Sequence, residues 1–175
     1  MNKAKQLQRQ HEKSVAEQFI KLYNQGFIFD RLGNDKNEPD ILFKKGKEFL
    51  GLEVTDIWYR NIDAEQAWTV ARGKRIPFRI EKSWGGLLKN PKDTLFDSIL
   101  RILNDKLIKK YQFPEKRILI LNHNSPQQSP LTELDDIKDC IEKIQDAIKD
   151  NWLEINNFQE VYIYFENYFY KIYPL

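Results

Sequence analysis

Two carboxylates in the first third of the chain, Asp40 and Glu53, have the residue type and spacing that metal chemistry needs. Each belongs to a short run rich in Ile, Leu, Phe and Val, and Gly46-Lys47 separates the two runs. A glycine in the first loop position suits a two-residue type II′ turn, so the segment predicts a β-hairpin. In the register that this turn sets, Asp40 pairs with Glu53 and both side chains lie on one face.

A pair of like charges at opposed strand positions is destabilising, because their Cβ atoms lie roughly 4.5–5.5 Å apart. A hard cation such as Mg²⁺ or Mn²⁺ between the two carboxylates would remove the repulsion, since such ions prefer oxygen ligands. The alternative is a hairpin whose carboxylates simply point into water. The other face of the hairpin is apolar and is predicted to be core, with the residues Ile41, Phe43, Leu50, Leu52 and Val54.

Two predicted helices carry charged side chains where their apolar stripe should continue. Glu12 falls in the middle of the stripe of the first helix, which ends near Gly26. In a second amphipathic helix, predicted over 95–111, Lys106 and Lys110 fall within the apolar arc. Either these side chains snorkel to water from the ends of their stripes, or an acid and a base are aimed at the paired carboxylates.

The order of elements indicates the fold class. Helix, strand, hairpin, polar middle, helix, strand, helix and strand follow one another, which predicts an α/β protein with a central mixed β-sheet flanked by helices. The continuous apolar run 117–121 is typical of a strand covered on both faces. A length of 175 residues predicts a single domain over 1–175. Cys140 is the only cysteine, which excludes an internal disulfide and a cysteine zinc cluster.

Net charge and hydropathy give weaker indications. The chain has 28 basic and 26 acidic residues, a formal net charge of +2, so its overall charge does not point to a partner. The first residues are polar and basic and lack the apolar core of a leader peptide. No run approaches the roughly 20 apolar residues of a membrane span. We therefore expect a cytoplasmic protein without membrane association.

The polar middle of the chain, an insertion at about 57–94, is both basic and aromatic. Between positions 60 and 92 eight basic residues stand against three acidic ones, with Trp and Phe interleaved. Cations contact phosphates and aromatic faces stack on exposed bases, so the segment predicts nucleic-acid contact. The alternative is a solvated insertion whose aromatic side chains pack onto the core. The residues expected to contact nucleic acid are Arg60, Arg72, Lys74, Arg75, Arg79, Lys82 and Trp84.

Pro39-Asp40 followed by Glu53-Val54-Thr55, within this order of elements, resembles the PD-(D/E)XK nuclease superfamily. The resemblance covers roughly residues 10–122 and implies a restriction-endonuclease-like α-β-β-β-α-β core. It also implies metal-dependent hydrolysis of phosphodiester bonds, with Mg²⁺ or Mn²⁺ as cofactor and nucleic acid as partner, DNA rather than RNA. Cutting both strands of a duplex takes two sites, so a homodimer is compatible with the resemblance.

The resemblance also implies roles for individual residues. Asp40 and Glu53 would hold the metal, and Glu12, the first-helix acid, would be a further metal ligand on the far side of the site. The chain departs from the family pattern at position 55, where Thr55 replaces the motif lysine. A threonine hydroxyl at this position can still bind a water molecule.

Some members of the superfamily carry the motif lysine on the helix after the strand meander. This makes Lys106 the first candidate and Lys110 the second. A lysine at the site would orient the attacking water or neutralise developing negative charge. If neither lysine reaches the site, the fold is catalytically inactive. Two other functions stay open: a nuclease-like fold without activity that binds nucleic acid or a protein partner, and a protein-interaction module that uses the aromatic stretch 162–173.

Overall fold

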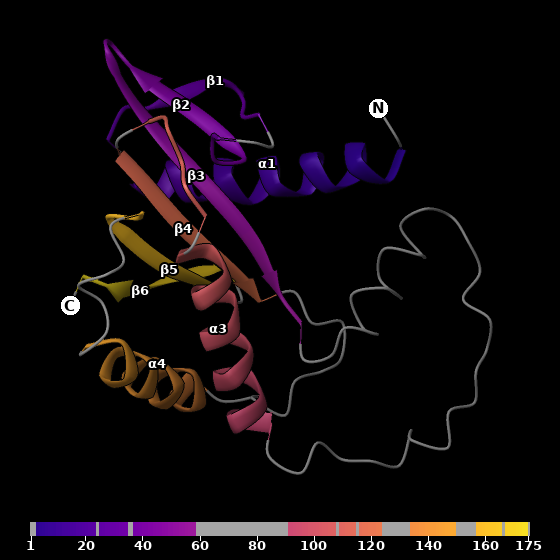
Figure 1. Cartoon of the computed structure of the whole chain (residues 1–175). Coiled ribbons are helices and arrows are strands. Elements are labelled where there is room, and N and C mark those ends of the chain that lie inside the picture. Colours follow the sequence, from indigo (N-terminus) through magenta and orange to yellow (C-terminus); the bar gives the residue numbers. More distant parts are fainter. Residues whose placement is uncertain are drawn as a thin grey trace.

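The structure, a computed structural model, describes residues 3–23, 25–34, 37–58, 91–107, 109–114, 116–123, 134–149, 157–165 and 167–174. Within these residues the chain forms helices and one six-stranded sheet (Figure 1). The elements are α1 (Lys3–Tyr23), β1 (Ile28–Leu32), β2 (Ile41–Lys45), β3 (Glu48–Ile57), α3 (Pro91–Leu107), β4 (Lys116–His123), α4 (Leu134–Lys149), β5 (Glu160–Phe165) and β6 (Tyr168–Tyr173).

The sheet is mixed, and its strands lie side by side in the order in which they follow along the chain. β1, β2 and β3 form an antiparallel meander, and β5 and β6 form an antiparallel pair. β4 lies parallel to both β3 and β5, so the connections through α3 and α4 are crossovers. The predicted α/β class with a central mixed sheet flanked by helices is confirmed.

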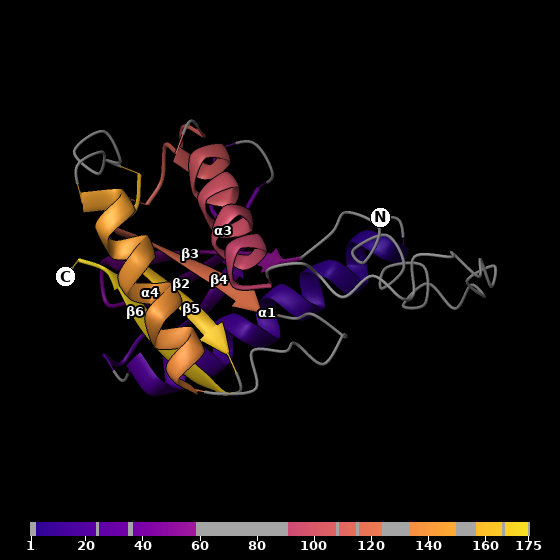
Figure 2. The ribbon, with the colours of Figure 1, turned by 90° about the horizontal axis from the view of Figure 1, so that it is seen from below.

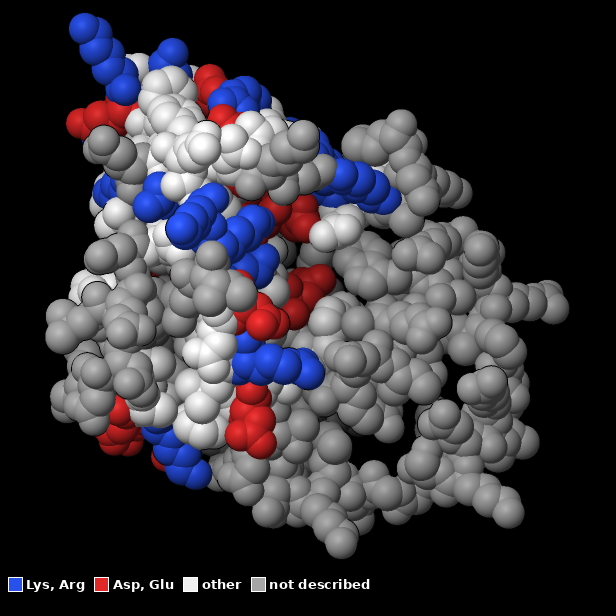
Figure 3. All heavy atoms as spheres, viewed as in Figure 1, with Lys and Arg blue, Asp and Glu red and all other residues white. Residues whose placement is uncertain are grey.

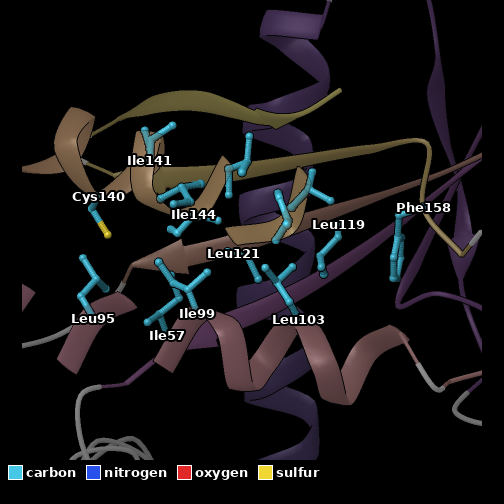
Figure 4. Packing of buried hydrophobic residues seen from close by; sticks show 14 of the residues in the cluster. Ile57, Leu95, Ile99, Leu103, Leu119, Leu121, Cys140, Ile141, Ile144 and Phe158 are labelled. Atoms are coloured by element: carbon cyan, nitrogen blue, oxygen red, sulfur yellow. The ribbon is translucent and has the colours of Figure 1, made fainter. Parts of the chain in front are cut away.

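Helices cover both faces of this sheet, as the view from below shows (Figure 2). α1 lies on one face, where its apolar side chains pack against residues of β2, β3 and β4. α3 and α4 lie on the other face and contact each other. Two successive right-handed crossovers that advance in one direction place both helices on the same face, as found here. The core beneath α3 and α4 is aliphatic around Ile99, Leu119 and Ile144 (Figure 4).

The predicted hairpin is confirmed, including its register. Lys45 pairs with Glu48 and Leu42 with Gly51. Gly46 has a φ of 60°, the left-handed value that the first loop position of a type II′ turn requires. The face predicted as core is buried beneath α1. On the opposite face, Ile57 of β3 belongs to the core cluster beneath α3, whereas Glu53 and Thr55 line a polar cavity.

The helix predicted over 95–111 begins and ends earlier, at Pro91 and Leu107. Proline suits the first helical position, since the amide hydrogen that it lacks would have no partner there. Beyond the helix, the side-chain amide of Asn157 donates to the carbonyl oxygen of Lys109 at 2.6 Å. The ring of Tyr111 lies against Phe158 with centroids 5.5 Å apart. These tertiary contacts favour a non-helical backbone after Leu107, although the apolar pattern of the sequence continues to Tyr111.

The basic and aromatic insertion connects β3 to α3. β3 ends at Ile57 and α3 begins at Pro91, but residues 59–90 lie outside the described part of the chain. None of the described helices is long and apolar enough to cross a membrane. The aromatic stretch 162–173 forms β5 and β6, and two of its rings, those of Tyr162 and Phe169, pack edge-on against Phe19 of α1.

Gly33 fixes the segment that leads into the hairpin, and its substitution has a predictable effect. Its amide donates to the carbonyl oxygen of Asp40 at 2.9 Å. A Cβ atom at Gly33 would overlap the backbone carbonyl of Pro39, which cannot move without displacing Asp40. We expect Gly33→Ala to lower the free energy of unfolding by about 1–3 kcal/mol. Urea unfolding checks this prediction, and an unchanged midpoint with an unchanged slope would contradict it.

Candidate functional site

Asp40 and Glu53 meet at the edge of the hairpin that faces α3. Ile41 pairs with Leu52, which places Asp40, the residue just before β2, beside Glu53 of β3. The backbone amide of Val54 donates to Oδ2 of Asp40 at 2.9 Å and holds this carboxylate in place. The Glu53 side chain is only 1% exposed. Two carboxylates from neighbouring strands thus lie together in a mostly buried setting.

A polar cavity of about 370 Å³ opens in front of these carboxylates. Residues of α1 and of α3 both line this cavity. α1 reaches it because Asp40, just before β2 begins, lies close to α1. α1 contributes Gln8 and Glu12, and Glu12 is only 8% exposed although it is charged. The space-filling view shows acidic and basic side chains gathered together over the middle of the molecule, between the β1–β3 end of the sheet and α3 (Figure 3).

Two lysines bind the same oxygen of Glu53. The Nζ atom of Lys106, in the last turn of α3, lies 2.7 Å from Oε1 of Glu53. The Nζ atom of Lys109, just beyond the helix, lies 3.0 Å from the same oxygen. Lys106, the first candidate from sequence, therefore reaches the paired carboxylates. Lys110, the second candidate, lies after the helix end, where the helical period no longer applies, and its side chain is exposed. The prediction that Lys110 faces the sheet was wrong.

Within the described part of the chain, three buried oxygen atoms have no hydrogen-bond partner, and all three belong to this region. They are Oε2 of Glu53, Oγ1 of Thr55 and the hydroxyl of Tyr111. Thr55 points to the same side of β3 as Glu53 and lines the cavity. Buried polar atoms are normally satisfied, so each exception needs a reason. Burial and then the charge of the nearby Glu53 raise the pKa of Tyr111, so its hydroxyl belongs to the surroundings of this carboxylate. Glu53 and Thr55 present oxygen atoms at the cavity that suit a cation or a water molecule.

The surroundings shift the pKa values of the two central carboxylates in opposite directions. Burial, and then the charges of Glu53 and Glu12, raise the pKa of Asp40 to about 7. Burial alone would also raise the pKa of Glu53, but the Lys106 and Lys109 ammonium groups outweigh it and hold this pKa below its usual range. The pKa of Glu12 is raised, first by burial and then by the charges of neighbouring carboxylates. Glu53 is therefore the ionised member, and Asp40 takes up a proton near neutral pH.

The ligand set suits a magnesium-type ion. In the described part of the chain, no group of three or more His, Cys, Asp or Glu side chains is arranged to hold a metal ion. Glu12 lines the same cavity as Asp40 and Glu53. Mg²⁺ is commonly held by one or two carboxylates while waters and substrate phosphates complete its shell. Asp40 and Glu53 supply two carboxylates, and Oε2 of Glu53 is unused. These residues fit Mg²⁺ or Mn²⁺.

A second polar cluster, which sequence reasoning missed, adjoins the cavity. Oδ1 of Asp56 accepts a hydrogen bond from the side-chain amide of Asn122 at 2.6 Å and lies 3.0 Å from Nε2 of His11. The hydrogen bond to Asp56 raises the pKa of His11 despite its partial burial. Asp56 lines the cavity and pairs with Asn122 across the parallel β3–β4 ladder. No local pattern encodes this pairing, so the sequence held no signal for the cluster.

The structure thus brings together Glu12, Asp40, Glu53, Thr55 and Lys106 of the residues expected from sequence. It adds Lys109, Gln8 and Asp56 to the lining of the cavity. The seven residues expected to contact nucleic acid fall within 59–90 and lie outside the described residues. Trp58, the last described residue before that segment, lines the cavity.

Comparisons with known proteins find no matching family model, no curated protein of significant sequence similarity and no solved structure of significant structural similarity. The function is therefore inferred from the geometry and chemistry of the site itself.

Proposed function

We propose that this protein is a metal-dependent nuclease that hydrolyses phosphodiester bonds in nucleic acid, with DNA as the preferred substrate. The observation that carries the proposal is the pairing of Asp40 with the almost fully buried Glu53 at a polar cavity that also holds two lysines. A buried carboxylate pair opposes folding through repulsion and desolvation, so a functional reason for keeping it is needed.

The order of α1, β1, β2, β3, α3 and β4 supports the proposal. It is the α-β-β-β-α-β order expected of the restriction-endonuclease-like fold. The pair Asp40 and Glu53 stands at the positions that correspond to the two acidic residues of the PD-(D/E)XK motif. Thr55 takes the place of the motif lysine, and Lys106 of α3 supplies an ammonium group at the carboxylate pair instead.

Each residue of the site has a role in the proposed reaction. Asp40 and Glu53 would hold Mg²⁺ or Mn²⁺, which supplies Lewis-acid activation of the phosphodiester. Lys106 presents a compact positive charge that orients the attacking water or offsets negative charge gathering on the phosphate oxygens. Thr55 offers a hydroxyl for a water molecule on the same side of β3. Addition of water across one P–O bond gives a phosphomonoester and a free hydroxyl group.

A cleavage assay tests the proposal. Labelled duplex DNA, single-stranded DNA and RNA are incubated with the protein and Mg²⁺, Mn²⁺ or EDTA. We expect DNA to be cut with either metal and to stay intact with EDTA, and Lys106→Met to slow the cutting at least 100-fold. Metal-independent cutting would reject the proposed chemistry. DNA that is bound but never cut would favour the alternative, an inactive nuclease fold that only binds.

A further inference from the structure

The charge balance around Glu53 is unusual, because two ammonium groups share one of its oxygens. Lys106 and Lys109 lie 2.7 and 3.0 Å from Oε1, and Oε2 has no hydrogen-bond partner among the described residues. One ammonium group would suffice to neutralise one carboxylate. A divalent cation that binds Glu53 would meet the positive charges of both ammonium groups at this carboxylate.

The two lysines differ in how they are held. Lys106 belongs to the last turn of α3 and is 22% exposed. Lys109 lies beyond the helix and is 34% exposed, so its side chain borders solvent. Two hydrogen bonds hold the backbone of Lys109. The Asn157 side chain donates to the Lys109 carbonyl oxygen, and the Lys109 amide donates to the Lys106 carbonyl oxygen at 3.4 Å. The side chain of Lys109 is therefore the one that can leave Glu53 without disturbing the fold.

Lys109 makes a second favourable contact from the same position. Its Nζ atom lies 4.9 Å from the centroid of the Tyr111 ring, close enough for a cation–π contact. Glu53 is therefore not the only group that stabilises this ammonium group. Lys109 also lines the cavity, and its side chain is partly exposed.

We propose that Lys109 is an exchangeable counter-ion of the site, a role that rests on the proposed nuclease function. Without a divalent cation, Lys109 neutralises Glu53. When the cation binds Asp40 and Glu53, Lys109 leaves Glu53 and contacts a phosphate of the nucleic acid beside the bond that is cut. Lys106 stays with Glu53 in both states. Lys109 is thus a substrate-binding residue that pairs with Glu53 until the metal ion binds.

The proposal predicts that loss of Lys109 strengthens metal binding, an effect that damage to the structure would not produce. Mn²⁺ is titrated calorimetrically into the full chain without nucleic acid. We expect Lys109→Met to bind Mn²⁺ about tenfold more tightly than the original protein, because one competing charge is gone. Lys110→Met is the matched control: it removes the same charge from the next, exposed residue, and we expect unchanged Mn²⁺ affinity.

A second measurement tests the contact with phosphate. Binding of a fluorescent duplex oligonucleotide is followed against salt concentration, with Ca²⁺ as the divalent cation. One lost phosphate contact lowers the slope of log affinity against log salt by about 0.9. We expect this decrease for Lys109→Met and not for Lys110→Met when Ca²⁺ is present. With EDTA the two variants should have the same slope, because Lys109 then remains on Glu53.

The outcomes separate this inference from the function on which it rests. If the original protein binds no Mn²⁺, the nuclease proposal fails. If it binds Mn²⁺ but Lys109→Met binds it no more tightly than Lys110→Met, the exchange role of Lys109 is overturned and the nuclease proposal stands. Lys109→Gln, which keeps a polar side chain without the charge, gives the same comparison if the methionine variant does not fold.

Discussion

Asp40→Asn and Glu53→Gln should change stability in opposite directions while both abolish metal-dependent cleavage. We expect either substitution to reduce cleavage by at least 1000-fold, since each removes one of two carboxylates proposed to hold the metal. At pH 8 we expect Asp40→Asn to raise the free energy of unfolding by about 2 kcal/mol and Glu53→Gln to lower it by a similar amount.

The gain for Asp40→Asn follows from its pKa. The folded-state pKa of Asp40 is raised from 3.8 to about 7. Between these values the folded state binds more protons than the unfolded state, so stability is lost as the pH rises from about 4 to about 7. At pH 8 the ionised carboxylate opposes folding. Asparagine carries no charge and keeps an oxygen for the Val54 amide. At pH 4 the gain should disappear.

The loss for Glu53→Gln has the opposite cause. The folded-state pKa of Glu53 is lowered, so its ionised form stabilises the protein above pH 4.5 and this stability is lost as the pH falls through the folded-state pKa. Its removal takes away the carboxylate oxygen that Lys106 and Lys109 share and leaves the two ammonium groups close together. Removing one partner of a fully buried pair costs about 3–5 kcal/mol. The partial exposure of both lysines reduces this to about 2 kcal/mol.

Urea unfolding at pH 4 and pH 8, together with the cleavage assay, measures both effects. Glu17→Gln on the exposed part of α1 is a control that removes one negative charge away from the cavity. Two substitutions that both destabilise at pH 8 would contradict the assignment of Asp40 as the strained member of the pair. Cleavage that survives both substitutions would reject the site.

Metal affinity should depend steeply on pH below neutrality. Asp40 binds a proton below about pH 7, and a metal ligand must be deprotonated. We therefore expect the affinity for Mn²⁺ to rise almost tenfold per pH unit between pH 5.5 and 6.5 and to level off above pH 7.5. Near pH 6, close to one proton should be released for each ion bound.

Calorimetric titration in two buffers of different ionisation enthalpy gives both the affinity and the number of protons released. In Asp40→Asn most of the proton release and of the pH dependence should be lost, because burial raises the pKa of Asp40 to about 7 and asparagine cannot bind this proton. An affinity that is constant from pH 5.5 to 7.5 would show that Asp40 does not bind the ion.

The hairpin could be predicted from sequence because its determinants are local. Gly46 fixes the turn, the turn fixes the register, and the register places Asp40 beside Glu53. Helical period likewise identified Glu12 and Lys106 as charged residues on inward-facing arcs. These inferences need only the geometry of one element and the direction of its apolar face.

The residues that sequence missed depend on contacts between distant elements. Lys109 reaches Glu53 because α3 ends at Leu107, and contacts with Asn157 hold the chain beyond that point. Asp56 meets Asn122 through the register of two parallel strands, which no turn or local pattern sets. The sequence prediction continued the helical period past Leu107, where α3 ends, and therefore chose Lys110. The residue that lines the cavity is its neighbour, Lys109.

Diffraction from crystals grown with Mn²⁺ tests the central claim most directly, because anomalous scattering locates the ion without reference to activity. We expect one anomalous peak within about 2.5 Å of an oxygen of both Asp40 and Glu53, with Oε2 serving as the Glu53 ligand. Mn²⁺ bound elsewhere on the protein, with both carboxylates free of metal at saturating concentration, would contradict the proposal.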